Sequence, residues 1–259
     1  MANQDFGIIV QMEKDLYLLQ KQEGETPLEC IERAKEEGVI PKGQKATYAG
    51  RLDPMASGLL LVLTGEKVHE KEKYLSFDKE YEVEVLFGVS TDTGDVLGEI
   101  QSVKKDFILN KEDLSVAIQK CIGEFEEHYP KYSSKTIEGK PVFLLARLGK
   151  VFKSPKHTVK IHSIEVISDK SMTGEEIASL NISRIQKVKG DFRQGSIVSK
   201  WEDFSKENAR EEFHILKIKV SCASGAYMRV LAEKIGSILD TPALAFSIKR
   251  TKVGEYVLQ

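Results

Sequence analysis

Two stretches that lie far apart in the sequence, residues 80–87 and 216–222, carry an apolar side chain at every second position. A period of two places neighbouring side chains on opposite faces of a strand, so each stretch predicts a half-buried β-strand. Residues 16–19, 159–167 and 213–215 also fit strands, although their patterns are shorter or less regular. The chain is therefore expected to fold around a β-sheet.

Three segments carry the period of an α-helix. Thr26-Pro27-Leu28-Glu29 is a capping box with proline at the first helical position, which predicts a helix over Thr26–Glu37 that ends at Gly38. A second helix is predicted over Asn110–Cys121, and a third follows the turn at Gly225. The positions expected on one side are Leu28, Ile31, Ala34 and Lys35 in the first helix, Leu114, Ala117, Ile118 and Cys121 in the second, and Val230, Leu231, Ile235 and Ile238 in the third. Because helices and strands are mixed without a regular βαβ rhythm, the sequence predicts an α+β fold on antiparallel sheet.

Composition excludes several classes of protein. Of the 259 residues 41% are hydrophobic, but the longest apolar run, Leu59–Leu63, is far shorter than the ~20 residues of a membrane helix. No basic segment followed by an apolar one begins the chain, so we expect no secretory signal. The three cysteines are far apart and show no metal-ligand spacing with the five histidines, which favours a reducing cytoplasm and no bound metal.

Charge is segregated along the chain, although the formal net charge is only −2. Residues 131–160 hold eight Lys or Arg and one acid, whereas residues 11–40 hold eight Asp or Glu and four Lys or Arg. Two thinner basic stretches are Lys187, Lys189, Arg193 and Lys200, and then Lys249, Arg250 and Lys252. Each stretch alone would also suit a solvated strand face or loop. Together they favour binding to RNA or DNA phosphates.

The most unusual local sequence is Gly50–Gly58, which contains Asp53-Pro54 and precedes the apolar run. Proline keeps Asp53 out of helical geometry, and the flanking glycines allow the backbone a tight path. An acid on a rigid loop against an apolar wall suits a catalytic carboxylate. An ordinary Asx-turn explains the same residues and stays open at this point.

Two further segments invite a chemical interpretation. Asp92-Thr93-Gly94 is the tripeptide of aspartic proteases, which pair two such carboxylates, so one copy would require a dimer. A structural turn after the strand at residues 80–87 is the simpler use.

Arg229 lies in the first turn of its predicted helix, where the helix dipole disfavours a cation, so an anion is expected beside it. The chain contains no Walker A motif and no GxGxxG, so a nucleotide cofactor has no support.

These segments resemble the TruB family of RNA pseudouridine synthases. Gly50–Gly58 is similar to the family motif G-x-L-D-P-x-A-x-G, Lys79-Glu80-Tyr81 to K-x-Y, and Ser224–Arg229 to S-G-T-Y-I-R. The other collinear matches are Gly88 with Thr91–Gly98 to G-x-x-T-x-T-x-D-x-x-G, Tyr129–Ser134 to P-P-x-Y-S-A, Ala146–Gly149 to A-R-x-G, and Ile248–Gly254 to L-R-R-T-x-V-G. Each match is weak alone, but seven in one order are specific and cover nearly the whole chain.

The resemblance implies the pseudouridine synthase fold, a mixed and mostly antiparallel central sheet flanked by helices. It makes Asp53 the catalytic residue, Tyr81 the ring that stacks on the target base, and Arg229 the partner that holds Asp53 charged and oriented. Ile248 would form an apolar wall under the base, and no metal or organic cofactor is required. The residues expected to bind RNA are Lys21, Arg51, Lys131, Lys135, Arg147, Lys249 and Arg250.

The implied reaction converts a uridine in RNA to pseudouridine after the base is flipped out, with uridine 55 of the tRNA T loop as the expected target. Tyr48 stands where bacterial members have a His that helps position the base, so we expect it in the active site. The chain stops at Gln259, so residues 1–259 are expected to form one catalytic domain without a C-terminal PUA-type domain, as a cytoplasmic monomer. The alternatives are the same chemistry on another RNA and a non-catalytic RNA-binding or RNA-folding protein.

Overall fold

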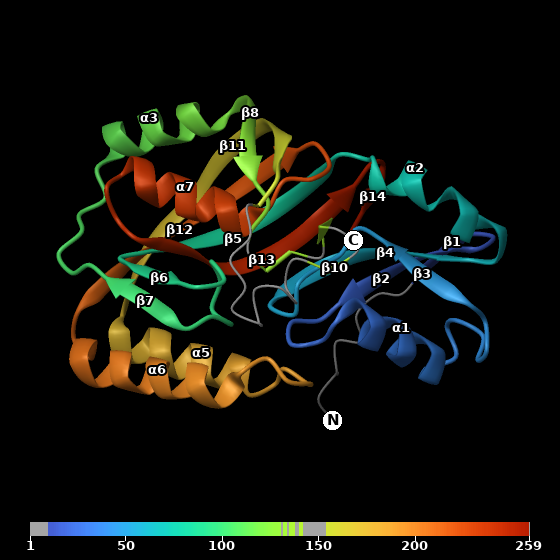
Figure 1. The fold of residues 1–259 in the computed structure, drawn as a ribbon, viewed down its shortest axis with the longest axis horizontal. Helices are drawn as coiled ribbons and strands as arrows, with labels where there is room; N and C mark the ends of the chain where they lie inside the picture. Colours follow the sequence, from blue (N-terminus) through green and yellow to red (C-terminus); the bar gives the residue numbers. More distant parts are fainter. Residues whose placement is uncertain (1–9, 131, 134, 138–139, 142–153, 259) are drawn as a thin grey trace.

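The computed structural model describes residues 10–130, 132–133, 135–137, 140–141 and 154–258. Within these ranges, ten strands form one large sheet and two pairs of short strands lie outside it (Figure 1). The strands of the large sheet are β1 (Val10–Glu13), β2 (Leu16–Lys21), β3 (Ala46–Ala49), β4 (Ala56–Thr64), β5 (Lys79–Phe87), β8 (Gly123–His128), β11 (Lys156–Thr173), β12 (Glu212–Cys222), β13 (Ala243–Val253) and β14 (Tyr256–Val257). The short pairs are β6 (Val89–Thr91) with β7 (Ile100–Val103), and β9 (Thr136–Ile137) with β10 (Lys140–Pro141).

The order across the large sheet is β1-β2-β4-β13-β5-β12-β11-β8, with β3 beside β4 and β14 beside β13. Among the described strands, β13 and β4 form the one parallel pair, and every other pairing is antiparallel. The two alternating stretches of the sequence pair with each other in β5 and β12. Residues 213–215 and 216–222 belong to one continuous strand, β12, rather than to two. A mixed, mostly antiparallel sheet flanked by helices confirms the expected fold class.

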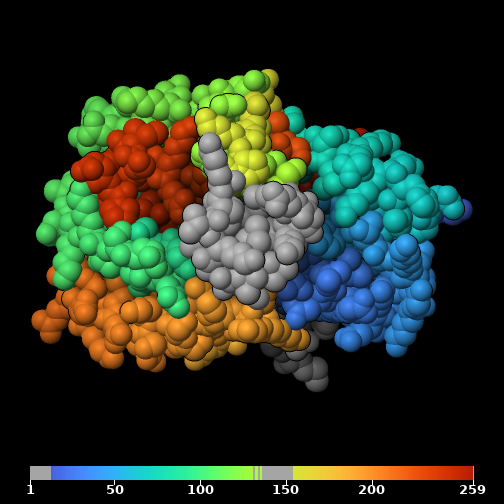
Figure 2. All heavy atoms as spheres, in the orientation of Figure 1, coloured from blue at the N-terminus to red at the C-terminus, as the bar shows by residue number. Residues whose placement is uncertain are grey.

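The helices cover different parts of the sheet (Figure 1). They are α1 (Pro27–Glu36), a 3₁₀ turn (Gly65–Glu70), α2 (Lys71–Leu75), α3 (Lys111–Cys121), α5 (Gly174–Ile185), α6 (Gln194–Asn208) and α7 (Met228–Ile238). α3 and α7 pack against one face of β5, β12 and β11, and α5 with α6 close a second core around Trp201. Figure 2 shows the surface of α5 and α6 in orange and, across the molecule, that of α1 and the first strands in blue. None of these helices, in the ranges that the structure describes, is long and apolar enough to cross a membrane.

The helix signals in the sequence operate as expected. Thr26 caps α1, its hydroxyl accepting the Glu29 N–H at 3.3 Å while the Glu29 carboxylate accepts the Thr26 N–H at 2.7 Å. Asn110 caps α3, and all four of its predicted apolar positions are buried, which confirms that face.

Two predicted helix faces are partly wrong. Leu28 is 63% exposed, because α1 turns the stripe of Pro27, Cys30, Ile31 and Ala34 onto the sheet instead. In α7 the half-buried Val230 and Ile238 lie at the margin of a stripe formed by Met228, Leu231, Ala232, Ile235 and Gly236. A helix advances about 100° per residue, so when the buried stripe is centred one position away from the predicted one, residues at the margin of the predicted stripe become exposed.

Candidate active site

The loop that carries Asp53 connects β3 to β4, and glycines with positive φ stand at its start and just after it, in β4. Gly50 has φ +88° and Gly58 has φ +104°, and the Ala56 N–H donates to the Asp53 carbonyl at 3.0 Å. A Cβ on Gly58 would lie 2.2 Å from the carbonyl oxygen of Arg250, so the parallel pairing of β4 with β13 requires glycine there. The Asp53 side chain is therefore presented by a backbone with little freedom.

Two buried cations tie this loop to neighbouring strands. The Lys21 ammonium, on β2, donates to the carbonyls of Pro54 at 3.3 Å and Ala56 at 2.5 Å. The Arg250 guanidinium, on β13, donates to the carbonyl of Gly50 at 3.0 Å and to that of Leu59 at 2.8 Å. Backbone carbonyls that would otherwise lie unsatisfied in the interior thus receive charged donors.

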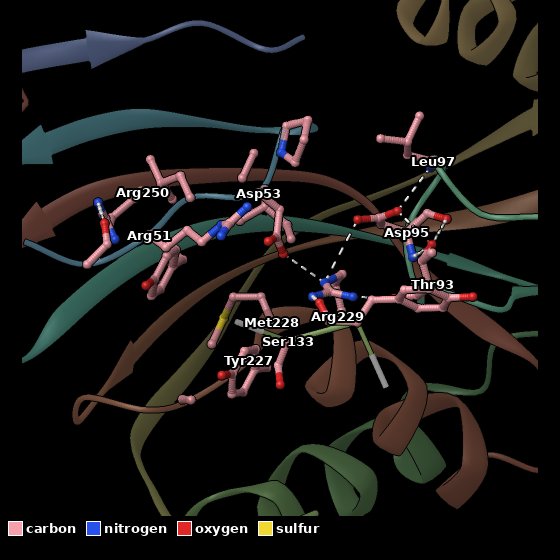
Figure 3. Close-up of a pocket in the computed structure, with 18 of the residues that line it drawn as sticks. Arg51, Asp53, Thr93, Asp95, Leu97, Ser133, Tyr227, Met228, Arg229 and Arg250 are labelled. Carbon is pink, nitrogen blue, oxygen red and sulfur yellow. Dashed lines mark hydrogen bonds and ion pairs between the residues drawn. The ribbon is translucent and has the colours of Figure 1, made fainter. Parts of the chain in front are cut away.

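Arg229 lies between two carboxylates, as Figure 3 shows. Its Nε is 2.9 Å from Oδ2 of Asp53 and 3.8 Å from Oδ2 of Asp95. Its Nη1 donates to the Thr93 carbonyl at 2.6 Å and its Nη2 to the Tyr132 carbonyl at 3.3 Å. The Nε–H does not align as a hydrogen bond to either carboxylate, so the contact with Asp53 is a close charge pair. The anion expected beside Arg229 is therefore a pair of carboxylates.

The two carboxylates differ in their access to the cavity. The Asp53 side chain is 32% exposed, whereas that of Asp95 is 9% exposed. Asp95 accepts hydrogen bonds from the Thr93 hydroxyl at 2.8 Å and the Leu97 N–H at 3.0 Å. Burial raises the pKa of Asp95, although the Arg229 charge acts in the opposite direction. Burial lowers the pKa of Arg229, but the negative groups around it, Asp53 and Asp95 first among them, together raise it by more, so the guanidinium stays charged.

The cavity in front of Asp53 has a volume of about 660 Å³. Tyr81 on β5 and Ile248 on β13 give it an apolar wall, and both side chains are nearly buried. Burial raises the pKa of Tyr81, so its hydroxyl stays protonated. Tyr227, at the start of α7, lines the side near Met228 and Ser133 (Figure 3). A flat wall, a held carboxylate and a cavity of this size suit a single nucleobase with part of its sugar.

A second loop, before α6, contributes Phe192 and Arg193 to the cavity. Arg193 has φ +64°, and its Nη1 pairs with Oδ2 of Asp92 at 2.9 Å. The Arg193 guanidinium also lies over the ring of Tyr132, whose hydroxyl donates to Asp92 at 3.1 Å. Asp92 further accepts the Glu99 N–H at 2.9 Å. Both carboxylate oxygens of Asp92 are thus occupied by contacts that stabilise the turn, which agrees with the predicted structural turn after residues 80–87.

The structure brings together Asp53, Tyr81, Arg229, Ile248 and Arg51, all of which line the cavity. Arg51 is exposed at its mouth. Lys135 is exposed outside the cavity, with its ammonium 5.3 Å from the centre of the Tyr129 ring. The expected RNA-binding residues Lys131 and Arg147 lie outside the described residues.

Four other expectations are corrected. Lys21 and Arg250 are 0% and 1% exposed, because both donate to backbone carbonyls in or beside the Asp53 loop, so neither presents a cation on the outer surface. Arg250 does line the cavity. Lys249 alternates with Ile248 and Arg250 on β13 and therefore points to the opposite face of the sheet, in register with Glu82. Tyr48 lies outside the cavity, packed on the core beneath α1 with its ring 5.6 Å from the Lys71 ammonium.

Three contributors to the site, Asp95, Tyr227 and the 192–193 loop, are not among the residues predicted from the sequence. Asp95 stands inside the matched Thr91–Gly98 stretch, and Tyr227 inside Ser224–Arg229, so the motifs held a signal for both. Arg193 was visible only as one member of a thin basic stretch. Among the described residues, no three His, Cys, Asp or Glu side chains are grouped to hold a metal ion.

Comparisons with known proteins agree with this geometry. The model of the family "TruB family pseudouridylate synthase (N terminal domain)" matches residues 39–189. The chain is 30% identical to tRNA pseudouridine synthase B of Borreliella burgdorferi (strain ZS7) over 248 residues, which are 96% of this chain and 72% of that protein. It is 29% identical to the protein of the same name from Nostoc sp. (strain PCC 7120) over 233 residues, which are 90% of this chain and 65% of that protein.

Solved structures give the same fold. A Cbf5-Nop10-Gar1 complex matches with a TM-score of 0.54 at 18% identity, over 92% of this chain and 50% of that chain. An H/ACA RNP bound to a substrate RNA containing 2′-deoxyuridine matches with a TM-score of 0.52 at 17% identity, over 93% of this chain and 49% of that chain. The chain thus spans about half the length of these structural neighbours. The match to the family model and the identity to its members show that this chain belongs to the TruB family of pseudouridine synthases and is an isomerase that makes pseudouridine.

Proposed function

We propose that this enzyme converts uridine 55 in the T loop of tRNA to pseudouridine, with Asp53 as its catalytic residue. The observation that carries the proposal is the contrast between the two carboxylates beside Arg229. Asp53 is the one with a third of its side chain open to the cavity, whereas Asp95 is enclosed by Thr93, Leu97 and Arg229. The names of the relatives, tRNA pseudouridine synthase B, support tRNA as the RNA.

The reaction breaks the N1–C1′ glycosidic bond of uridine and forms a C5–C1′ bond, while C5 loses a proton and N1 gains one. A uridine inside folded RNA must first leave its stack, which costs a few kcal/mol. The faces of Tyr81 and Ile248 offer a surface on which the flipped base can stack. Asp53 then acts on the base or on the ribose, and Arg229 keeps its carboxylate charged and oriented during that step.

The RNA backbone is proposed to cross the mouth of the cavity near Arg51, with Lys135 as a further contact. Arg51 is exposed there, two residues from Asp53, so it can reach a phosphate beside the flipped nucleotide. Lys249 offers a matched control, since it is an exposed cation on the opposite face of the sheet. We further propose that the enzyme acts as a monomer. A single catalytic domain over residues 1–259 and a cytoplasmic location stay predictions.

The test is pseudouridine mapping on unmodified tRNA transcripts with the wild-type enzyme, with Asp53→Asn and with Asp203→Asn. Asp203 is a control because it is an exposed aspartate on α6, ion-paired with Lys206. We expect pseudouridine at position 55 from the wild type and Asp203→Asn, and none from Asp53→Asn. Product from Asp53→Asn would refute the catalytic role, and product at another uridine would refute the target. Binding without product from the wild type would refute tRNA as the substrate and favour another RNA.

A further inference from the structure

A pair of titratable side chains lies behind the Tyr227 wall of the cavity and takes no part in the proposed chemistry. Glu127 on β8 and His157 on β11 face each other in register, with Nε2 of His157 3.7 Å from Oε1 of Glu127. Their side chains are only 12% and 11% exposed. An acid and an imidazole this well buried on neighbouring strands are in a position to influence each other's hydrogen bonds.

His157 connects this pair to the active site. Its Nε2 is 3.1 Å from the carbonyl oxygen of Gly225, so this nitrogen carries the proton and donates it. Its ring stacks on Tyr129, with centroids 3.9 Å apart and planes 11° apart, and meets the ring of Tyr227 edge-on at 6.0 Å. Gly225 and Tyr227 both line the cavity that contains Asp53. His157 is not itself among the residues that line this cavity, so it acts on the cavity through Gly225 and Tyr227.

The hydrogen bonding of the pair is incomplete. Oε1 of Glu127 and Nδ1 of His157 are buried and have no hydrogen-bond partner among the described residues. The Nε2–H is thus one donor between two acceptors, the Gly225 carbonyl and the Glu127 carboxyl group. A buried carboxylate without a partner is costly, so an ionised Glu127 attracts this N–H strongly and a neutral one does so weakly.

We propose that Glu127 and His157 are positioning residues for pseudouridine formation, in which the charge of Glu127 decides whether His157 holds the Gly225–Tyr227 turn against the cavity. With a neutral Glu127, the Nε2–H stays on the Gly225 carbonyl and the Tyr227 wall is fixed. With an ionised Glu127, the carboxylate competes for the same proton and the turn loosens.

The surroundings of the pair make this change occur near neutral pH. Burial raises the pKa of Glu127 to about 7, while the ammonium of Lys234 on α7 acts in the opposite direction. The hydroxyl of Tyr227 stays neutral, because burial raises its pKa to about 12. The neighbouring Glu126 is exposed and pairs with Lys156 at 3.4 Å, which leaves it free of the His157 site.

The test compares single-turnover rates of pseudouridine formation on the tRNA transcript from pH 6 to pH 8.5 for the wild type, Glu127→Gln and Glu126→Gln. Glutamine keeps the shape of Glu127 but cannot ionise. We expect the ratio of the wild-type rate to the Glu127→Gln rate to fall about threefold or more across this range, in the direction that ionisation of a group with a pKa near 7 requires. The ratio of the wild-type rate to the Glu126→Gln rate should stay constant, and a constant ratio for Glu127→Gln as well would overturn the proposal.

A second variant tests the contact with Gly225. His157→Phe keeps a ring to stack on Tyr129 but loses the donor, so we expect a rate about tenfold lower with an unchanged Kd for tRNA, since small misplacements in an active site lower rates strongly. His157→Gln returns a donor and should recover part of the rate. An unchanged rate in His157→Phe, or a loss of affinity in proportion to the rate, would refute a positioning role.

The use of tRNA in these assays rests on the proposed function, and different results refute the two proposals. A wild type that makes no pseudouridine in the transcript refutes the tRNA target. In that case the same pH comparison is made on whichever RNA the enzyme does modify. An active wild type with a constant ratio refutes the role of Glu127 alone.

Discussion

Replacing Arg229 with methionine should remove the charge that holds the active site together, at a predictable loss of stability. Arg229 contacts two carboxylates, Asp53 and Asp95, and donates to the carbonyls of Thr93 and Tyr132. Removing one partner of a buried ion pair costs about 3–5 kcal/mol, because a buried charge is left without compensation. Burial already raises the pKa of Asp95, so in the variant this group takes up a proton and limits the loss. We expect about 3 kcal/mol at pH 7, a large part of the 5–15 kcal/mol typical of whole proteins.

The loss of stability in Arg229→Met should depend on pH. A carboxyl whose pKa is raised in the folded protein binds its proton more tightly there than in the unfolded chain, so the free energy of unfolding falls as pH rises through that interval. Without Arg229 the interval widens, and the deficit of Arg229→Met relative to wild type should be larger at pH 8 than at pH 5. In Arg229→Met/Asp95→Asn the buried acid is gone, so the added pH dependence should disappear and about 1–2 kcal/mol should return.

Urea unfolding at pH 5 and pH 8 measures the stability of the wild type, Arg229→Met, Asp95→Asn and the double variant. Single-turnover assays on tRNA should show that neither variant without Arg229 regains activity, because the charge beside Asp53 is missing from both. An additive double variant, with a coupling energy below about 0.5 kcal/mol, would refute an energetic link between Arg229 and Asp95.

Three further outcomes are expected. Gly58→Ala should destabilise the protein by more than about 2 kcal/mol in urea unfolding, since the new Cβ would lie 2.2 Å from the Arg250 carbonyl oxygen and φ is +104°. A urea midpoint equal to that of the wild type would contradict this close approach. The free energy of unfolding of Lys21→Met should lie further below that of the wild type at pH 10 than at pH 7.5, because burial lowers the pKa of Lys21 from 10.5 to about 8. Between these two pH values the folded wild type loses the Lys21 proton while the unfolded chain keeps it, so the wild type gains on the order of 3 kcal/mol of stability in urea unfolding and the variant does not. The same pH dependence of stability in both proteins would contradict this. Arg51→Ala should weaken tRNA binding about tenfold and reduce the salt dependence of Kd by about one phosphate contact, whereas Lys249→Ala should leave both unchanged; equal effects in filter binding would refute the assigned face.

Local patterns predicted the elements well, because capping and periodicity are properties of neighbouring residues. The capping box at Thr26 and the buried faces of α3 and β5 were all visible in this way. Exact faces were less accessible. The environment of Leu28 depends on how α1 is rotated against the sheet, which no local pattern specifies.

The candidate site shows the same division. The loop around Asp53 and the position of Arg229 in a first helical turn could be recognised from motifs. The role of neighbouring cations could not. Lys249 and Arg250 are equivalent in sequence, but alternation along β13 sends one to solvent and the other under the Asp53 loop. The meeting of Arg193 with Asp92 depends on two loops about a hundred residues apart, which only the tertiary fold brings together.

The place of β13 in the sheet constrains when the enzyme can first become active during its synthesis. This strand follows all the other long strands in sequence, yet it lies between β4 and β5 at the centre. Until residues 243–253 have left the ribosome, the strands on its two sides have no shared neighbour and the carbonyl of Gly50 lacks its guanidinium. Sheet closure over such sequence distances is slow compared with helix formation. A nascent chain can therefore hold folded helices and both halves of its sheet while the Asp53 loop is still unassembled.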